Sequence, residues 1–221
     1  MEKLIENQDN KEAEPKIEVV FDYSVEDEKE RVFSTLKKYH WYKENGYKPK
    51  YPKLIQERLE KDEKVKKEDI LEAVSAEFDQ EKYREEVDLI IKEWDEIKDK
   101  FFESLKTLNL PLQDKYFVCV TKYGTGGSYG LPNNVQLNIE QKRVLTITLA
   151  HEIVHLTIEP LIKEYKITHW VKERLVDLII DKFFPESKRI QRDPENSEKV
   201  SEIFEKYFPD INKIIIEISK P

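Results

Sequence analysis

The chain has 221 residues, enough for one sizeable domain or for a small domain with an extension. Its net charge is −8 and no basic stripe dominates, so nucleic acid is not an expected partner. The lone Cys119 excludes an intramolecular disulfide framework. The start of the chain lacks the apolar core of a signal peptide, and no apolar run approaches the length of a membrane span. We therefore expect a cytoplasmic protein with no membrane partner.

The first half of the chain is expected to be mainly helical. Residues 1–16 are polar and are predicted to form a disordered tail, and 17–24 have the composition of a short strand. Three segments show helical spacing or composition, at 25–42, near 52–61 and over 67–105, the last as one long helix or two. This N-terminal region, 17–112, carries no evident catalytic constellation. It is predicted to be a scaffold, a wall of a cleft or a cover over it.

A strand, a glycine cluster and a second strand are predicted next. Residues 115–121 are β-branched and aromatic, 123–130 hold four of the five glycines, and 135–139 alternate apolar with polar side chains. The pattern favours a small antiparallel sheet. The glycines do not fit a phosphate-binding loop, so they indicate either a flexible hairpin tip or a sheet edge that a peptide backbone can approach. On the second interpretation the expected substrate-binding residues are Gly126, Gly127, Ser128, Tyr129, Asn133, Asn134 and Val135.

The segment that follows has the pattern H-E-x-x-H, formed by His151, Glu152 and His155 in a mostly aliphatic helix. Residues four apart share one helical face, so the two imidazoles are able to bind one Zn²⁺. Glu152 would then be the general base for a metal-activated water. The alternative is a chance motif whose histidines make ordinary hydrogen bonds in the core.

A third ligand is needed for a catalytic zinc site. Five downstream side chains are candidates: Glu159, Glu164, His169, Glu173 and Asp177. Glu159 stands before Pro160, where the helix is expected to end or kink, and Glu164 lies in a charged, solvated stretch. Glu173 and Asp177 share one face of a second helix that is predicted to begin after Thr168. Two carboxylates placed so repel each other unless a cation or donor intervenes.

We therefore expect Glu173 to bind the metal and Asp177 to accept the free ring N–H of a ligand histidine. The alternative is a solvated acidic stripe that pairs with Lys172 and Arg174.

The spacing His151-Glu152-x-x-His155, with Glu173-x-x-x-Asp177 some eighteen residues on, resembles the gluzincin clan of zinc metallopeptidases. It is most similar to the compact minigluzincins, over a zincin-like core at 113–184. The resemblance implies one Zn²⁺ per chain, a peptide or protein substrate, and Glu152 as general base and acid. The oxyanion-stabilising Tyr or His of larger members has no clear counterpart, which leaves His169 or a tyrosine.

Residues 185–221 are predicted to be a C-terminal helical extension, with a linker at 193–198, a helix near 197–208, and a helix or strand at 211–218. The expected fold class is α+β, with the motif helix and the glutamate helix beside the small sheet. The leading functional hypothesis is a zinc metallopeptidase. The alternatives are a latent or non-catalytic zinc protein with a structural, regulatory or protein-binding role, and a helical adaptor whose motif is accidental. The sequence leaves the oligomeric state open.

Overall fold

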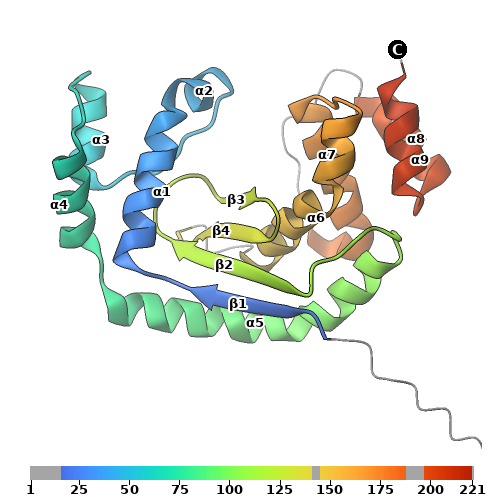
Figure 1. Ribbon diagram of the computed structural model, residues 1–221, viewed down its shortest axis with the longest axis horizontal. Coiled ribbons are helices and arrows are strands. Elements are labelled where there is room, and N and C mark those ends of the chain that lie inside the picture. The colour runs from blue at the N-terminus through green and yellow to red at the C-terminus, as the bar shows by residue number, and fades with distance from the viewer. Residues whose placement is uncertain (1–15, 141–144, 188–196, 221) are drawn as a thin grey trace, which may run out of the picture.

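The computed structural model describes residues 16–140, 145–187 and 197–220 (Figure 1). Its helices are α1 (Val25–Lys37), α2 (Tyr39–Glu44), α3 (Lys53–Glu60), α4 (Lys67–Glu77), α5 (Gln80–Lys106), α6 (Leu145–Glu164), α7 (His169–Phe183), the 3-10 turn η1 (Pro185–Ser187), α8 (Ser197–Tyr207) and α9 (Ile211–Ser219). Its strands are β1 (Glu18–Asp22), β2 (Lys115–Thr121), β3 (Gly127–Gly130) and β4 (Asn134–Asn138). The predicted tail, at 1–15, and most of the predicted linker, at 193–196, fall outside the described residues.

Local backbone geometry divides two of the segments that have a helical pattern into separate helices. Ser24 caps α1 by accepting a hydrogen bond from the Asp27 N–H at 3.0 Å, but the segment 25–42 is not continuous. It breaks at Lys38, which has non-helical dihedral angles, and α2 begins one residue later. The segment 67–105 is two helices, because Phe78 is extended and Asp79 caps the start of α5.

The sheet is mixed, so the expectation of an antiparallel sheet is wrong for most of its pairings. The strand order is β1-β2-β4-β3, with β1–β2 and β2–β4 parallel and only β3–β4 antiparallel. The reason lies in the connections. Helices α1 to α5 separate β1 from β2 in the sequence, and β3 separates β2 from β4, which gives the chain the crossovers that parallel neighbours require.

The glycine cluster is part of the sheet. It forms β3, which pairs with β4 in the register Gly127 to Leu137 and Gly130 to Asn134. β3 stands at one edge of the sheet. The interpretation of this segment as a sheet edge is therefore confirmed, and the edge strand is the glycine-rich segment itself.

Helix α6 is the central helix of the main core. It continues past Pro160 to Glu164, so the helix does not end at the proline as the sequence suggested it could. Ile158 and Ile162 are buried on either side of the proline, and their packing holds the last turn in place. By length and composition α6 is also apolar enough to cross a membrane, contrary to the expectation from sequence, but 72% of that stretch is buried inside the protein.

The helices are arranged around the sheet in two groups (Figure 1). Helices α1 to α4 stand at one end, α6 to α9 stand at the other, and the long α5 runs beneath the strands between them. The main core joins α5, β2, β4 and α6 to α9, with Trp94, Tyr116, Leu149 and Phe204 among its buried members. A smaller cluster joins α1, α3 and α4. The segment at 211–218, predicted as helix or strand, is helix α9, which packs against α8 and α6.

Candidate metal centre

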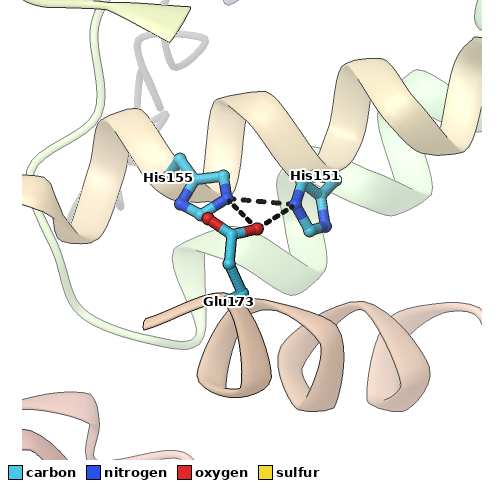
Figure 2. Close-up of side chains that lie close together, drawn as sticks. All are labelled: His151, His155 and Glu173. Carbon is cyan, nitrogen blue, oxygen red and sulfur yellow. Dashed lines mark hydrogen bonds and ion pairs between the residues drawn. The ribbon is translucent and has the colours of Figure 1, made fainter. Parts of the chain in front are cut away.

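His151 and His155 lie one turn apart on α6, with their rings turned toward α7 (Figure 2). Each is only 2% exposed, and their Nε2 atoms are 3.0 Å apart. The ring of Tyr129, on β3, stacks on the His155 ring with the centroids 4.7 Å apart. The two imidazoles therefore point one nitrogen each toward a common position.

Glu173 reaches the same position from α7 (Figure 2). Its Oε2 atom is 3.5 Å from His151 Nε2 and 3.3 Å from His155 Nε2. Among the described residues, these three side chains offer ligand atoms that all lie within 4.8 Å of one another. The packing of α6 against α7 thus brings Glu173 to the two histidines, although it lies some eighteen residues after His155 in the sequence.

The dimensions of this triad fit zinc. Zn²⁺ binds imidazole nitrogen at about 2.0–2.1 Å, and two ligands at a tetrahedral angle then lie roughly 3.3–3.4 Å apart. The measured separations of 3.0, 3.3 and 3.5 Å bracket that value. Two neutral imidazoles and one carboxylate are also a donor set typical of catalytic zinc sites.

Asp177 lies behind His151, as expected for a carboxylate that supports a ligand. Its Oδ1 atom faces His151 Nδ1 at 3.4 Å, and both atoms are buried without a hydrogen bond in the structure. An imidazole that binds a metal through Nε2 carries its proton on Nδ1. That proton would point at Asp177, which would fix the tautomer and the ring orientation.

The pKa shifts within the triad describe a buried charge pair between His151 and Glu173. Burial lowers the pKa of both imidazoles, but Asp177 and Glu173 outweigh it at His151, whose pKa is raised to about 9. Burial dominates at His155 and lowers its pKa to about 4. The pKa of Glu173 is strongly lowered, because both histidines stabilise its charged form despite its burial. A proton on His151 therefore balances the charged Glu173 carboxylate, and a metal cation bound at the centre would replace that proton and leave both imidazoles neutral.

Glu152 is held against the backbone of β3. A Cβ atom added to Gly127 would overlap the Oε1 atom of Glu152 and would stand 2.7 Å from Thr148 Cγ2. Position 127 therefore has no room for a side chain larger than that of glycine. The absence of a side chain lets the Glu152 carboxylate occupy the gap between α6 and the edge strand.

Substitution Gly127→Ala should displace the Glu152 carboxylate and lower any activity that depends on it by roughly tenfold or more, because misplacement of a catalytic group by about 1 Å can cost 100-fold. Turnover and zinc content of the purified variant test this, and zinc content should not change. Gly130→Ala is the matched control on the same strand, since its added Cβ has no neighbour closer than 4.0 Å. Equal losses in both variants would show that Glu152 does not depend on this gap.

A cleft with a volume of about 730 Å³ opens over the triad. Four of the expected substrate-binding residues line it: Gly126, Gly127, Ser128 and Tyr129. Asn133, Asn134 and Val135 are not among the residues that the structure places there. Asn134 and Val135 belong to β4, which pairs with β2 on one side and with β3 on the other. The Val135 side chain is buried in the core. The expectation that Asn134 and Val135 would contact substrate is therefore wrong, because β3 lies at the edge of the sheet and β4 lies inside it.

Glu159 belongs to the wall of the cleft and not to the triad. It accepts a hydrogen bond from the Tyr129 hydroxyl at 2.6 Å and lies 3.6 Å from Lys172. Lys172 in turn donates to the Tyr129 hydroxyl at 2.7 Å. This network explains how the buried Glu159 is satisfied without a metal, and it fixes the ring that stacks on His155. Glu164 is exposed, as predicted.

His169 lines the cleft at the start of α7 and contacts a residue that sequence reasoning did not select. Its Nδ1 atom is 3.7 Å from Glu173 Oε1, and its Nε2 atom is 3.0 Å from the hydroxyl of Tyr47. Tyr47 follows α2 and stacks between Trp41 and Trp170. Nothing in the local sequence marks Tyr47, because only the tertiary packing of α2 over the cleft brings it to this position.

Arg31, on α1, is a second residue that the sequence did not indicate. It is 3% exposed and donates hydrogen bonds to Ser128 Oγ at 2.8 Å and to Gln136 Oε1 at 2.6 Å. It also packs against Gly124, which has a positive φ of 81° and no room for a Cβ. Arg31 therefore ties the N-terminal helices to the strand that borders the cleft.

Comparisons with protein-family models, with curated proteins and with solved structures found no match to this chain.

Proposed function

We propose that this protein is a zinc-dependent peptidase of the gluzincin type. The observation that carries the proposal is the buried triad of His151, His155 and Glu173, whose ligand atoms have the separations of a tetrahedral zinc site. Glu152 inside the H-E-x-x-H motif and Asp177 behind His151 complete the pattern that resembles this clan. One Zn²⁺ per chain is expected.

His151, His155 and Glu173 would hold the metal, and a bound zinc supplies Lewis-acid activation of water and of the scissile carbonyl. Glu152 takes the proton of the attacking water and delivers it to the leaving amine. Asp177 keeps the His151 ring in the tautomer that leaves Nε2 free. The burial of the triad strengthens each of these electrostatic interactions.

The substrate peptide is proposed to lie along β3. This strand forms one edge of the sheet and lines the cleft beside Glu152. An extended peptide can add to such an edge through main-chain hydrogen bonds. Because Gly127 has no side chain, the Glu152 carboxylate lies directly beside this strand, where it would face the bound peptide.

The pair formed by Tyr47 and His169 is proposed to stabilise the oxyanion. Both residues line the cleft, and they share a 3.0 Å hydrogen bond. Burial, together with the carboxylates of Glu173 and Glu152, raises the pKa of Tyr47 to about 12. Its phenol is therefore protonated at neutral pH and remains a hydrogen-bond donor.

An open cleft favours the enzyme over the latent zinc protein. The residues that line it come from the α1–α2 layer, from β3 and the loop before it, and from α6 and α7. Helices α8 and α9 contribute no side chain to it, so the described part of the C-terminal extension does not fill it.

The direct test is hydrolysis of a mixture of unstructured peptides by the protein before and after zinc removal. We expect cleavage by the zinc-loaded protein, complete loss of cleavage after dialysis against a chelator, and recovery when one equivalent of zinc is returned. Metal analysis should give one zinc per chain. Absence of cleavage by fully loaded protein would exclude the peptidase function and favour the non-catalytic alternative.

A further inference from the structure

We propose that the cleft selects peptides that carry carboxylate groups beside the scissile bond, an inference that rests on the peptidase function proposed above. In the part of the chain that the structure describes, the cations that line the cleft are four lysines and no arginine: Lys38, Lys48, Lys163 and Lys172. They come from the end of α1, the segment after α2, α6 and α7. The cations therefore surround the cleft instead of clustering on one exposed helix.

Each carboxylate that lines the cleft is expected to be balanced by a positive charge of the site itself. Glu152 and Glu173 face the metal position, where a divalent cation balances their two charges. Glu159 is shared by two lysines, with its carboxylate oxygens 3.6 Å from Lys172 and 3.8 Å from Lys163. Glu159 and these two lysines together therefore carry a net charge of +1.

Lys38 and Lys48 add two further positive charges to the cleft. Both are exposed, and neither has an ion-pair partner among the described residues. They stand on the wall formed by the α1–α2 layer, beside Trp41 and Tyr47. A carboxylate on a bound peptide would meet these ammonium groups, and among the described residues no acid of the α1–α2 layer lines the cleft.

The contrast with the rest of the molecule strengthens the selection. The chain carries a net charge of −8, so its surface as a whole repels acidic peptides. A zinc-loaded cleft with surplus lysines is a local positive region bounded by low-dielectric walls, and such clefts concentrate ligands of opposite charge. Salt should weaken the preference, because Lys38 and Lys48 are exposed to solvent.

The test compares three peptides of one sequence in which the residues flanking a central apolar segment are Glu, Gln or Lys. Binding is measured by calorimetry on the zinc-loaded Glu152→Gln protein, and kcat/KM is measured on the wild type. We expect the Glu peptide to bind roughly tenfold more tightly than the Gln peptide, and the Lys peptide to bind most weakly. Copies with free and amidated carboxyl termini show whether the lysines recognise internal acids or the terminal carboxylate.

The double variant Lys38→Glu/Lys48→Glu should abolish the preference for Glu over Gln while the Gln peptide binds within about twofold of the parent. Lys37→Glu/Lys43→Glu is the matched control. It makes the same charge change in the same layer, at exposed residues that do not line the cleft. Equal binding of all three peptides, or an equal loss in the control, would overturn the proposal.

The two proposals fail in different ways. Preferential binding of the Glu peptide without hydrolysis would support the anionic selection and remove the peptidase function. Hydrolysis of all three peptides at equal kcat/KM would preserve the peptidase function and overturn the anionic selection.

Discussion

Glu152→Gln is expected to lower kcat by on the order of 10³-fold or more while the protein retains its zinc. The substitution keeps the size and shape of the side chain, so the close contact with Gly127 is preserved. Only the ability to accept and return a proton is lost. Zinc content by metal analysis and single-turnover cleavage of one peptide would separate metal binding from catalysis.

The informative comparison is with Gly127→Ala, which leaves the Glu152 carboxylate intact and moves it. If both variants lose activity and keep zinc, the role of Glu152 depends on its chemistry and on its position. Turnover by Glu152→Gln at the rate of the wild type would remove Glu152 as general base. Loss of zinc from this variant would instead show that the carboxylate supports the metal site.

Glu173→Ala is expected to weaken zinc binding by more than about 100-fold, because even supporting residues around a metal typically contribute 10- to 100-fold. Glu173 is the only member of the triad on α7, and its carboxylate also supplies negative charge to both histidines. Competition with a chromogenic chelator measures the change in affinity. Circular dichroism of the apo variant establishes that the helices are retained.

Two further variants make this prediction specific. Glu159→Gln removes a charge from another buried carboxylate of the cleft and preserves an acceptor for the Tyr129 hydroxyl, so zinc affinity should change by less than about threefold. Asp177→Asn should fall between the two, at roughly 10- to 100-fold. Unchanged zinc retention in Glu173→Ala would take this residue out of the ligand set, and a large loss in Glu159→Gln would point to Glu159 in its place.

Much of the secondary structure follows from local pattern. The strand at 115–121, the helix around the H-E-x-x-H motif and the helix that carries Glu173 all appear where periodicity predicts them. The prediction of one helix over 25–42 is wrong where local geometry interrupts the periodicity at Lys38, whereas the break at Asp79 agrees with one of the two alternatives left open for 67–105. Pro160 gives the opposite error, because packing on both sides of it overrides its tendency to end a helix.

The sheet was the least predictable part of the fold. Alternation along residues 135–139 indicates a strand but not its neighbours, and strand direction depends on connections that only the complete fold reveals. The pairing of β4 between β2 and β3 buried Val135 and gave the edge to the glycine-rich β3. The expected substrate-binding set was therefore divided, with four residues on the cleft and the others beneath or beside it.

The sequence by itself determined the chemistry of the candidate site. Spacing on a helix places His151 and His155 on one face, and the scarcity of histidine and the paired carboxylates on the next helix indicate Glu173 and Asp177 as their partners. Only the tertiary structure decided what surrounds that site. Tyr47, Arg31 and the lysines of the cleft wall act across long sequence separations, so no local periodicity marks them. Short-range helical geometry is encoded in residue spacing, whereas the walls of a cleft are set by how distant elements pack.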